Sequence, residues 1–265
     1  MTAQRMPLVF FGHGSPMNAL GYNRYTQAWR DFGRRAPRPT AILAISAHWY
    51  VPGTAVTAMP KPPTIHDFGG FPRALSEFQY PAPGSPALAQ RVRELLAPLA
   101  ARADDKWGLD HGTWSVLAHV YPQADIPVVQ LSIDSTRHPA FHYELGKQLA
   151  PLRDEGVLIA GFGNVVHNLG KLNWKEDAPA LDWAKRFSDA VRERIEKHDH
   201  QPLVGYESLG DDARPSIPTP EHYLPLLYIL GLQPENEPVT ILVDGIQNAS
   251  ISMLSVAIGK WNNDK

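Results

Sequence analysis

Cysteine is absent from this chain of 265 residues. Disulfide bonds and thiolate chemistry are therefore excluded, and any bound metal ion must be held by nitrogen and oxygen donors. An excess of charge of either sign is also missing, because 25 Lys and Arg residues are balanced by 27 Asp and Glu residues. This balance provides no electrostatic basis for binding nucleic acid or an anionic membrane, and it fits a small-molecule partner better.

Long apolar runs are missing as well. No stretch approaches the roughly 18 apolar residues of a membrane-spanning helix, and the N-terminal residues lack the charged-then-apolar pattern of a secretory signal. We therefore expect a cytoplasmic enzyme. With 43% hydrophobic residues, the chain is long enough for one large α/β domain, which we predict to extend over residues 1–265.

Short β-branched runs alternate with amphipathic segments along the chain. The runs PLVFF, AILAIS, PVVQLSI, VLIAG and VTILV are typical of strands buried on both faces. Helices are predicted to begin at Pro86, with Ser85 as N-cap, and to span residues 138–153 and 180–198. This alternation predicts a mostly parallel or mixed sheet covered by helices, in which ligands bind beyond the carboxyl ends of the strands.

Prolines and glycines interrupt residues 60–86 too often for regular structure. We predict a long ordered loop here, of the kind that often covers a binding site. Its aromatic residues are expected to close over a planar ligand, and they are Phe68, Phe71, Phe78 and Tyr80. Other candidates for a pocket wall are Trp49, Trp114 and Tyr223.

Histidine provides the candidate metal ligands, because 11 are present and five of them lie at the ends of predicted elements. His13 follows the run LVFF between two glycines, and His48 follows AILAIS. Two predicted parallel strands thus each end in a histidine, which is the arrangement that a metal at the carboxyl edge of a sheet requires.

Three more histidines lie in similar positions. His222 falls in the first turn of a helix that we predict to have Thr219 as N-cap and Pro220 as its first residue. His167 follows the strand VLIAG after a glycine-containing loop, and His111 lies just before a predicted helix. Most remaining histidines are interpreted as packing or solvated residues of helices, and these are His119, His138, His142, His198 and His200.

Other chemistries have weaker support in the sequence. No serine lies in a G-x-S-x-G elbow, so a serine hydrolase has no nucleophile. The segments GHGSP and GFGNVVHNLG match a dinucleotide fingerprint only in part, and no Walker lysine follows either of them. A metal centre built from histidines is therefore the favoured interpretation.

Eight motifs together resemble the class III extradiol ring-cleaving dioxygenase superfamily, and within it the 4,5-DOPA extradiol dioxygenase family. They are GHGSPMNAL, SAHWY, PPTIHDFGGFP, YPAPGSPALAQ, LDHGTWSVL, VVQLSID, GNVVHNL and PTPEHYLPLLY. The resemblance extends over nearly the whole chain. It implies a single α/β domain around a mixed sheet, one divalent metal ion, and cleavage of a DOPA-like catechol with O2 to a ring-opened semialdehyde.

The resemblance also implies roles for the five histidines. His13 and His48 match the two metal histidines at strand ends, and His222 matches the third ligand position. His167 matches a histidine close to the metal that acts as acid and base and is sometimes counted as a further ligand. His111 matches a histidine near the substrate.

One departure concerns the third ligand, because the wider superfamily uses two histidines and a glutamate. Glu221 precedes His222, but adjacent residues at a helix start point about 100° apart, so we expect only one of them to bind the ion. Three neutral imidazoles suit the Fe(II) expected for ring cleavage, and they also suit Zn(II).

Two alternatives to ring cleavage are left open by these residues. One is a zinc hydrolase on the same scaffold, in which His167 moves protons near a metal-bound water. The other is a non-enzymatic, metal-stabilised binding protein, because a fold does not determine a function. His111 and His167 weigh against the second alternative, because a structural metal site seldom needs additional acid–base groups.

Overall fold

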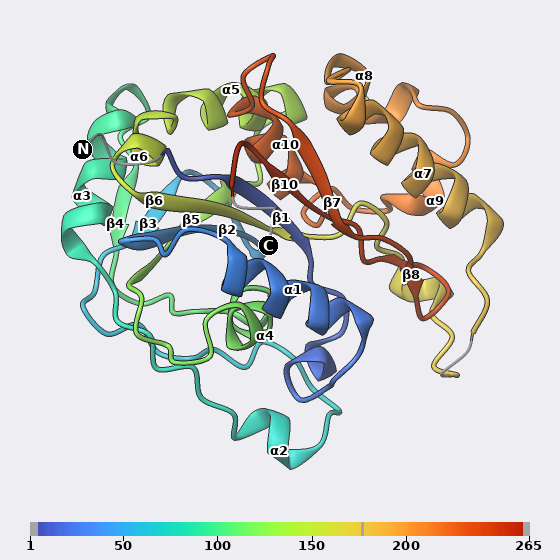
Figure 1. Ribbon diagram of the computed structural model, residues 1–265, viewed down its shortest axis with the longest axis horizontal. Helices are drawn as coiled ribbons and strands as arrows, with labels where there is room; N and C mark the ends of the chain where they lie inside the picture. Colours follow the sequence, from blue (N-terminus) through green and yellow to red (C-terminus); the bar gives the residue numbers. More distant parts are fainter. Residues whose placement is uncertain (1–4, 176–177, 262–265) are drawn as a thin grey trace.

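Strands from distant parts of the chain form one eight-stranded sheet in the computed structural model, which describes residues 5–175 and 178–261 (Figure 1). The strands of this sheet are β1 (Leu8–Gly12), β2 (Ala41–Val51), β3 (Ala55–Thr57), β4 (Arg102–Asp104), β5 (Val128–Asp134), β6 (Val157–Gly163), β7 (Val239–Val243) and β10 (Ser255–Ile258). Their order is β4-β3-β5-β2-β6-β1-β10-β7. The four central strands, from β5 to β1, run parallel, whereas β10 pairs antiparallel with both β1 and β7. A separate small ribbon joins β8 (Ile246–Gln247) and β9 (Ile251–Ser252).

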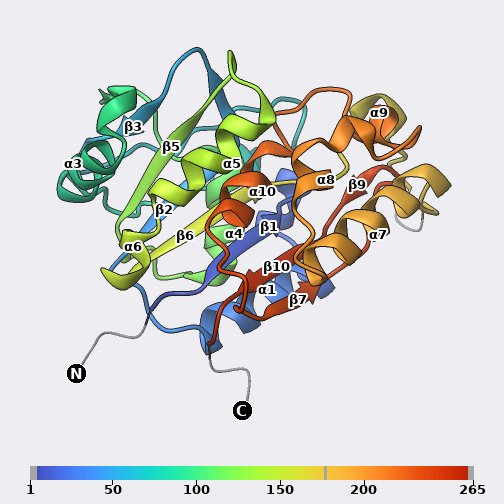
Figure 2. The same cartoon turned by 90° about the horizontal axis from the view of Figure 1, so that it is seen from above.

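Helices cover both faces of the sheet (Figure 1 and Figure 2). The α-helices are α1 (Arg24–Arg35), α2 (Arg73–Ser76), α3 (Pro86–Leu95), α4 (His111–Val120), α5 (Pro139–Gln148), α6 (Pro151–Asp154), α7 (Asp182–Glu196), α8 (Gln201–Val204), α9 (Ala213–Ser216) and α10 (Leu224–Gly231). Short 3₁₀ turns are η1 (Pro16–Ala19), η2 (Ala97–Leu99), η3 (Leu169–Lys171) and η4 (Tyr206–Ser208). Helices α1 and α4 pack together on one face, and α5 and α10 pack together on the other.

Alternation along the central strands places one hydrophobic core on each face. In β1, Leu8 and Phe10 belong to the core beneath α10, whereas Val9 and Phe11 belong to the core beneath α1 and α4. Successive side chains of a strand point to opposite faces, so a strand covered on both faces must be apolar throughout. The prediction of a mixed sheet covered by helices is confirmed.

Most predicted elements are present, with three differences. The run VTILV forms β7, but this edge strand is half-buried rather than buried on both faces, because β10 is the one described strand that pairs with it. The helix predicted over residues 138–153 is two helices, α5 and α6, since Pro151 cannot donate the backbone hydrogen bond that would join them.

The predicted helix start is confirmed at α3, where the Ser85 hydroxyl accepts from the backbone N–H of Leu88.

The third difference concerns the helix after residue 219. Thr219 is not its N-cap, because α10 begins only at Leu224, with Pro225 in its first turn. The Thr219 hydroxyl instead donates a hydrogen bond to Glu221. His222 therefore lies in the turn that precedes the helix. Among the described residues, no helix is both long and apolar enough to cross a membrane.

Candidate metal centre

His13 lies directly after β1, where the chain passes close to other backbone segments. Its backbone N–H donates to the carbonyl of Gly163 at the end of β6. A Cβ atom at Gly12 would lie 2.7 Å from the backbone carbon of Met253, so only glycine fits at this position. The prediction that His13 follows a strand is confirmed, and the glycine before it allows the close approach.

His48 lies within β2 and not after it, which corrects the predicted strand end. The pairing of β2 with β5 passes from Ile45 opposite Leu131 to Tyr50 opposite Ile133, so β2 carries extra residues at this point. Its pairing with β6 stops at Ser46. His48 therefore belongs to a bulged stretch, and such bulges often redirect a side chain next to an active site.

His222 is held in its turn by the end of β6. Its carbonyl accepts a hydrogen bond of 2.8 Å from the backbone N–H of Asn164. A Cβ atom at Gly163 would lie only 2.2 Å from that carbonyl oxygen. The absence of a side chain at Gly163 therefore allows the turn that carries His222 to lie against the strand that precedes His167.

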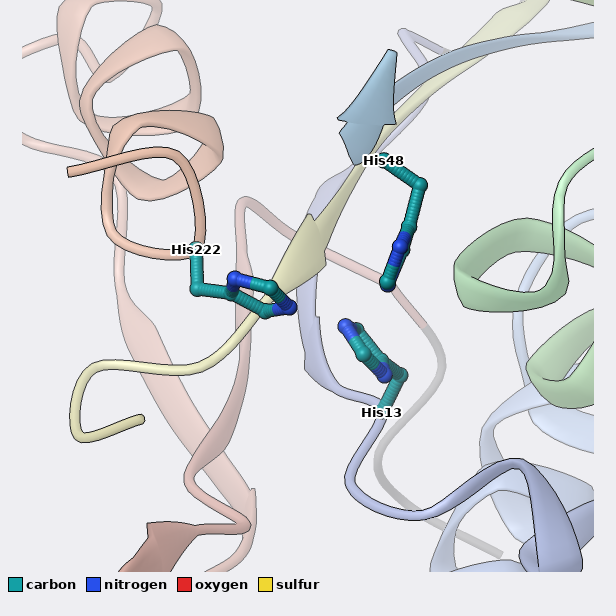
Figure 3. A group of neighbouring side chains, drawn as sticks. All are labelled: His13, His48 and His222. Atoms are coloured by element: carbon teal, nitrogen blue, oxygen red, sulfur yellow. The ribbon is translucent and has the colours of Figure 1, made fainter. Parts of the chain in front are cut away.

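The side chains of His13, His48 and His222 converge, with their rings pointing toward one another (Figure 3). The ring centroids lie 5.1 Å apart for His13 and His48, 5.4 Å for His13 and His222, and 5.1 Å for His48 and His222. One nitrogen from each ring lies within 4.8 Å of the others. The Nε2 atom of each ring is buried and has no hydrogen-bond partner among the described residues.

The opposite ring nitrogen, Nδ1, has an oxygen partner in all three cases. It lies 2.9 Å from the carbonyl oxygen of Gly14 for His13, 3.1 Å from Asp67 for His48, and 3.1 Å from Glu221 for His222. A histidine that binds a metal usually donates its other ring N–H to a carbonyl or carboxylate oxygen. Three buried Nε2 atoms without partners, backed in this way, fit one divalent ion.

His111 lies beside this group, as the first residue of α4. The helix begins there because the side chain of Asp110 caps it, accepting from the backbone N–H of Thr113. The His111 ring centroid lies 3.9 Å from that of His48, and its Nδ1 lies 2.9 Å from Asp67. Asp67 thus contacts two of the five predicted histidines.

His167 lies on the other side of the group, four residues after β6. Its ring stacks on that of His222, with centroids 3.4 Å apart and planes 7° apart. His167 is not part of the group formed by His13, His48 and His222, but it shares a second group with Glu221 and His222. The structure therefore brings together all five histidines that the sequence singled out.

Burial dominates the electrostatics of these histidines. It lowers the pKa of His13 and of His222 well below the usual range, and neighbouring histidines lower both further. It also lowers the pKa of His167 to about 3. These rings are neutral near pH 7, which is the form that binds a metal or accepts a proton.

Asp67 changes this balance at His48 and His111. Burial lowers the pKa of His48, but the hydrogen bond to Asp67 and the charges of Asp110, Asp67 and Glu221 raise it above the ordinary value. The pKa of His111 is lowered, chiefly by burial and then by His48, against the hydrogen bond to Asp67. Burial raises the pKa of Asp67 itself, yet its hydrogen bonds to both histidines hold that pKa well below the usual range.

A cavity of about 410 Å³ opens over the five histidines and Asp67. Its other walls come from four segments that are distant in the sequence, and they include Ser15, Pro16, Phe68, Phe71, Leu169, Leu172, Trp174, Asn248 and Ile251. In the described part of the chain, no lysine or arginine lines it. The cavity has room for a small aromatic ring between apolar walls and a polar floor.

The predicted loop over residues 60–86 is irregular apart from the short helix α2 and its last residue, Pro86, with which α3 begins. Phe68 and Phe71 line the cavity, as predicted for this loop. Phe78 and Tyr80 do not, because Phe78 stacks on Trp114 and Tyr80 is buried with its hydroxyl donating to the carbonyl of Tyr121. These two residues attach the loop to the core instead.

Three other predicted wall residues are also core residues. Trp49 stacks on Trp107, and Trp114 and Tyr223 are fully buried. Large aromatic side chains stabilise a protein most when they are buried in its core. Nothing in the local sequence distinguishes an aromatic residue of the core from one that lines the cavity. The aromatic residue that sequence reasoning missed is Trp174, which lines the cavity although 66% of its surface is exposed.

Sequence reasoning also missed Asp67 and misjudged the use of Glu221. Asp67 stands in the quoted motif PPTIHDFGGFP, next to the predicted wall residue Phe68, but no spacing rule connects it with His48 or His111. Glu221 was considered only as a competing ligand, whereas its carboxylate contacts Nδ1 of His222. A carboxylate adjacent to a candidate ligand is the signal that would have suggested this role.

Comparisons with known proteins show what this chain is similar to. The family model described as the catalytic LigB subunit of aromatic ring-opening dioxygenase matches residues 16–259. The protein named 4,5-DOPA dioxygenase extradiol from Escherichia coli strain K12 is 54% identical over 98% of this chain and 97% of its own length. The protein of the same name from Beta vulgaris is 38% identical over 88% of this chain and 89% of its own length.

A solved structure is similar along nearly the whole chain. The crystal structure of an uncharacterized protein from Escherichia coli K12 matches with a TM-score of 0.85 and 49% sequence identity. The match covers 96% of this chain and 100% of that chain.

Proposed function

We infer the function of this protein from the family to which it belongs, that of the catalytic LigB subunits of aromatic ring-opening dioxygenases. We propose that it is an extradiol dioxygenase that cleaves the ring of a catechol with O2 and yields a ring-opened semialdehyde. The substrate proposed is DOPA-like, and residues 1–265 form one catalytic domain. The relatives named 4,5-DOPA dioxygenase extradiol support this choice of substrate.

The observation that carries the proposal is the group of three buried Nε2 atoms without partners, at the floor of an apolar cavity. His13, His48 and His222 would hold one divalent metal ion, with Fe(II) expected for ring cleavage. Bound there, Fe(II) would supply a site at which a deprotonated catechol and O2 meet in one orientation. The remaining steps are assigned to side chains of this chain.

His167 is the proposed acid–base group. Burial lowers its pKa to about 3, so the ring is neutral near pH 7 and has a free lone pair. It would hold a catechol hydroxyl proton only transiently and return it later. Its ring lies on the cavity side of the site and stacks on His222, which places it within reach of a substrate bound next to that ligand.

His111 is proposed to stabilise negative charge on the substrate. Its Nδ1 is occupied by Asp67, so Nε2 is the ring nitrogen left for the cavity. A proton received there would make the ring cationic, with the Asp67 carboxylate balancing its charge. Phe68 and Phe71 would pack against the ring of the catechol and exclude water from it.

Oxygen uptake is the measurement that tests this function. The purified protein is reconstituted anaerobically with Fe(II) and then given L-DOPA or simple catechols in aerated buffer, with a zinc-loaded sample beside it. We expect O2 consumption and a yellow ring-opened product with Fe(II) alone, and neither with the His13→Ala variant. If no catechol causes O2 uptake with either metal, the proposal is wrong, and hydrolysis by the zinc form becomes the next activity to assay.

A further inference from the structure

Asp67 connects two histidines that come from different elements, His48 in β2 and His111 at the start of α4. Its Oδ1 accepts a hydrogen bond of 3.0 Å from the backbone N–H of His111 and lies 2.9 Å from the ring Nδ1 of the same residue. Its Oδ2 lies 3.1 Å from Nδ1 of His48. We propose that Asp67 is a positioning residue that keeps the proton of His48 on Nδ1 and so leaves Nε2 free for the metal. This inference rests on the metal centre of the proposed function.

The chemistry of the carboxylate determines which tautomer it favours. An ionised Asp side chain only accepts hydrogen bonds, so the ring nitrogen facing each of its oxygens must carry a proton. A neutral imidazole with its proton on Nδ1 has its lone pair on Nε2. In His48 this Nε2 is the buried atom without a partner that points toward His13 and His222.

An asparagine at this position would reverse the tautomer of His48 specifically. The backbone N–H of His111 is a donor that cannot change, so the amide oxygen of Asn must remain on that side. The amide NH₂ group then faces Nδ1 of His48. Two donors would oppose each other unless the His48 proton moved to Nε2, where it would block coordination.

The position of Asp67 in the chain gives this contact a second consequence. Asp67 immediately precedes Phe68, and both belong to the loop that forms one wall of the cavity. The loop is attached to the core through Phe78, which stacks on Trp114, and through the buried Tyr80. The loop that encloses the substrate therefore also orients one of the three metal ligands.

The test uses the full chain in metal-free form and compares Asp67→Asn, Asp67→Glu and the unmodified protein. Nitrogen-15 NMR at mildly alkaline pH, where imidazole is neutral, identifies the protonated ring nitrogen of His48, with His48→Gln used to assign its signals. Zn(II) affinity is then measured by competition with a chromophoric chelator. Glu77→Gln is the matched control, because Glu77 lies in the same loop and, among the described residues, its carboxylate pairs only with the exposed Arg73.

We expect the unmodified protein and Glu77→Gln to carry the His48 proton on Nδ1, and Asp67→Asn to carry it on Nε2. Asp67→Asn should bind Zn(II) about 10 to 100 times more weakly, which is the loss typical when an outer partner of a metal-bound histidine is removed. Asp67→Glu keeps two acceptor oxygens and should restore the Nδ1 proton and most of the affinity. Excess Fe(II) should restore full metal occupancy in Asp67→Asn, which a general loss of structure would not allow.

The inference is overturned if His48 of the unmodified protein carries its proton on Nε2, a result that needs no variant to fold. It is also overturned if Asp67→Asn keeps both the tautomer and the affinity of the unmodified protein. If the unmodified protein fails to bind Zn(II) or Fe(II) at all, the proposed function fails instead, and the NMR result still decides the tautomer.

Discussion

The imidazole rings of His167 and His222 lie face to face, with their centroids 3.4 Å apart and their planes 7° apart. His222 directs its Nε2 toward His13 and His48, whereas His167 belongs to a different group of potential ligands. A positive charge on His167 would lie against the ring of His222, which is proposed to bind a metal cation, and the two positive charges would repel each other. Burying the charge of His167 would cost further free energy. Both effects favour a neutral His167 that is free for proton transfer.

Replacing His167 separates its two suggested roles. We expect His167→Gln to lower kcat by about 10²–10⁴-fold, the usual contribution of a general acid–base group, while one metal ion stays bound per chain. Steady-state rates and metal analysis of the same sample provide the check. The control is His138→Gln, because His138 is an exposed histidine at the start of α5. A loss of the metal from His167→Gln would make His167 a ligand.

The lack of a side chain at Gly163 is predicted to be essential for the site. In Gly163→Ala the new methyl group would lie 2.2 Å from the carbonyl oxygen of His222, which is backbone and cannot rotate away. We expect a loss of about 1–3 kcal/mol in the free energy of unfolding together with weaker metal binding. In Gly205→Ala the nearest atom would be 3.7 Å away, so this variant should retain both properties. Denaturant unfolding and metal titration compare the two, and equal behaviour would contradict the assigned geometry.

The walls of the cavity predict a weak preference for the substrate's carboxylate. No lysine or arginine lines the cavity in the described residues, so the carboxylate of L-DOPA has no cationic partner there. We expect the kcat/KM for dopamine to lie within about tenfold of that for L-DOPA, a difference of less than about 1.4 kcal/mol. Parallel oxygen-uptake assays measure the ratio. A preference for L-DOPA of several hundredfold would require a cation that approaches the cavity when the substrate binds.

Acid sensitivity is predicted from His142, which is fully buried in α5 and contacts the hydroxyl of Tyr228. Burial lowers its pKa to about 4, whereas the unfolded chain has a value near 6.5. Between pH 4 and pH 6.5 the folded state binds fewer protons than the unfolded state. The stability that the fold gains from a neutral His142 is therefore fully present above pH 6.5 and is lost as the pH falls toward 4. The loss amounts to at most about 3 kcal/mol.

The variant His142→Gln tests this contribution. Its free energy of unfolding, measured in denaturant with metal bound, should fall less steeply from pH 6.5 to 4 than that of the unmodified protein. Parallel curves over this range would show that His142 does not titrate as its burial implies.

The fold and the candidate ligands were largely predictable because the signals that encode them are local. Apolar runs such as LVFF and AILAIS must be buried on both faces, which predicts central strands of an α/β sheet. Histidines next to glycine or at the ends of such runs lie at one edge of a parallel sheet, whatever the details of packing. His13 and His48 are predicted on these grounds, whereas His111 and His222 are predicted from expected helix starts and His167 from a loop after a strand. The structure brings all five together.

Tertiary structure alone decided how these histidines are supported and what surrounds them. The contacts of Asp67 with His48 and His111 join residues separated by 19 and 44 positions, and they depend on the path of an irregular loop. The division of aromatic residues between cavity and core, with Phe68 in the wall and Trp114 buried, likewise follows from packing between distant segments. Local patterns specify which side chains are apolar or able to bind a metal, but the partner of each is selected by three-dimensional packing, which has no period in the sequence.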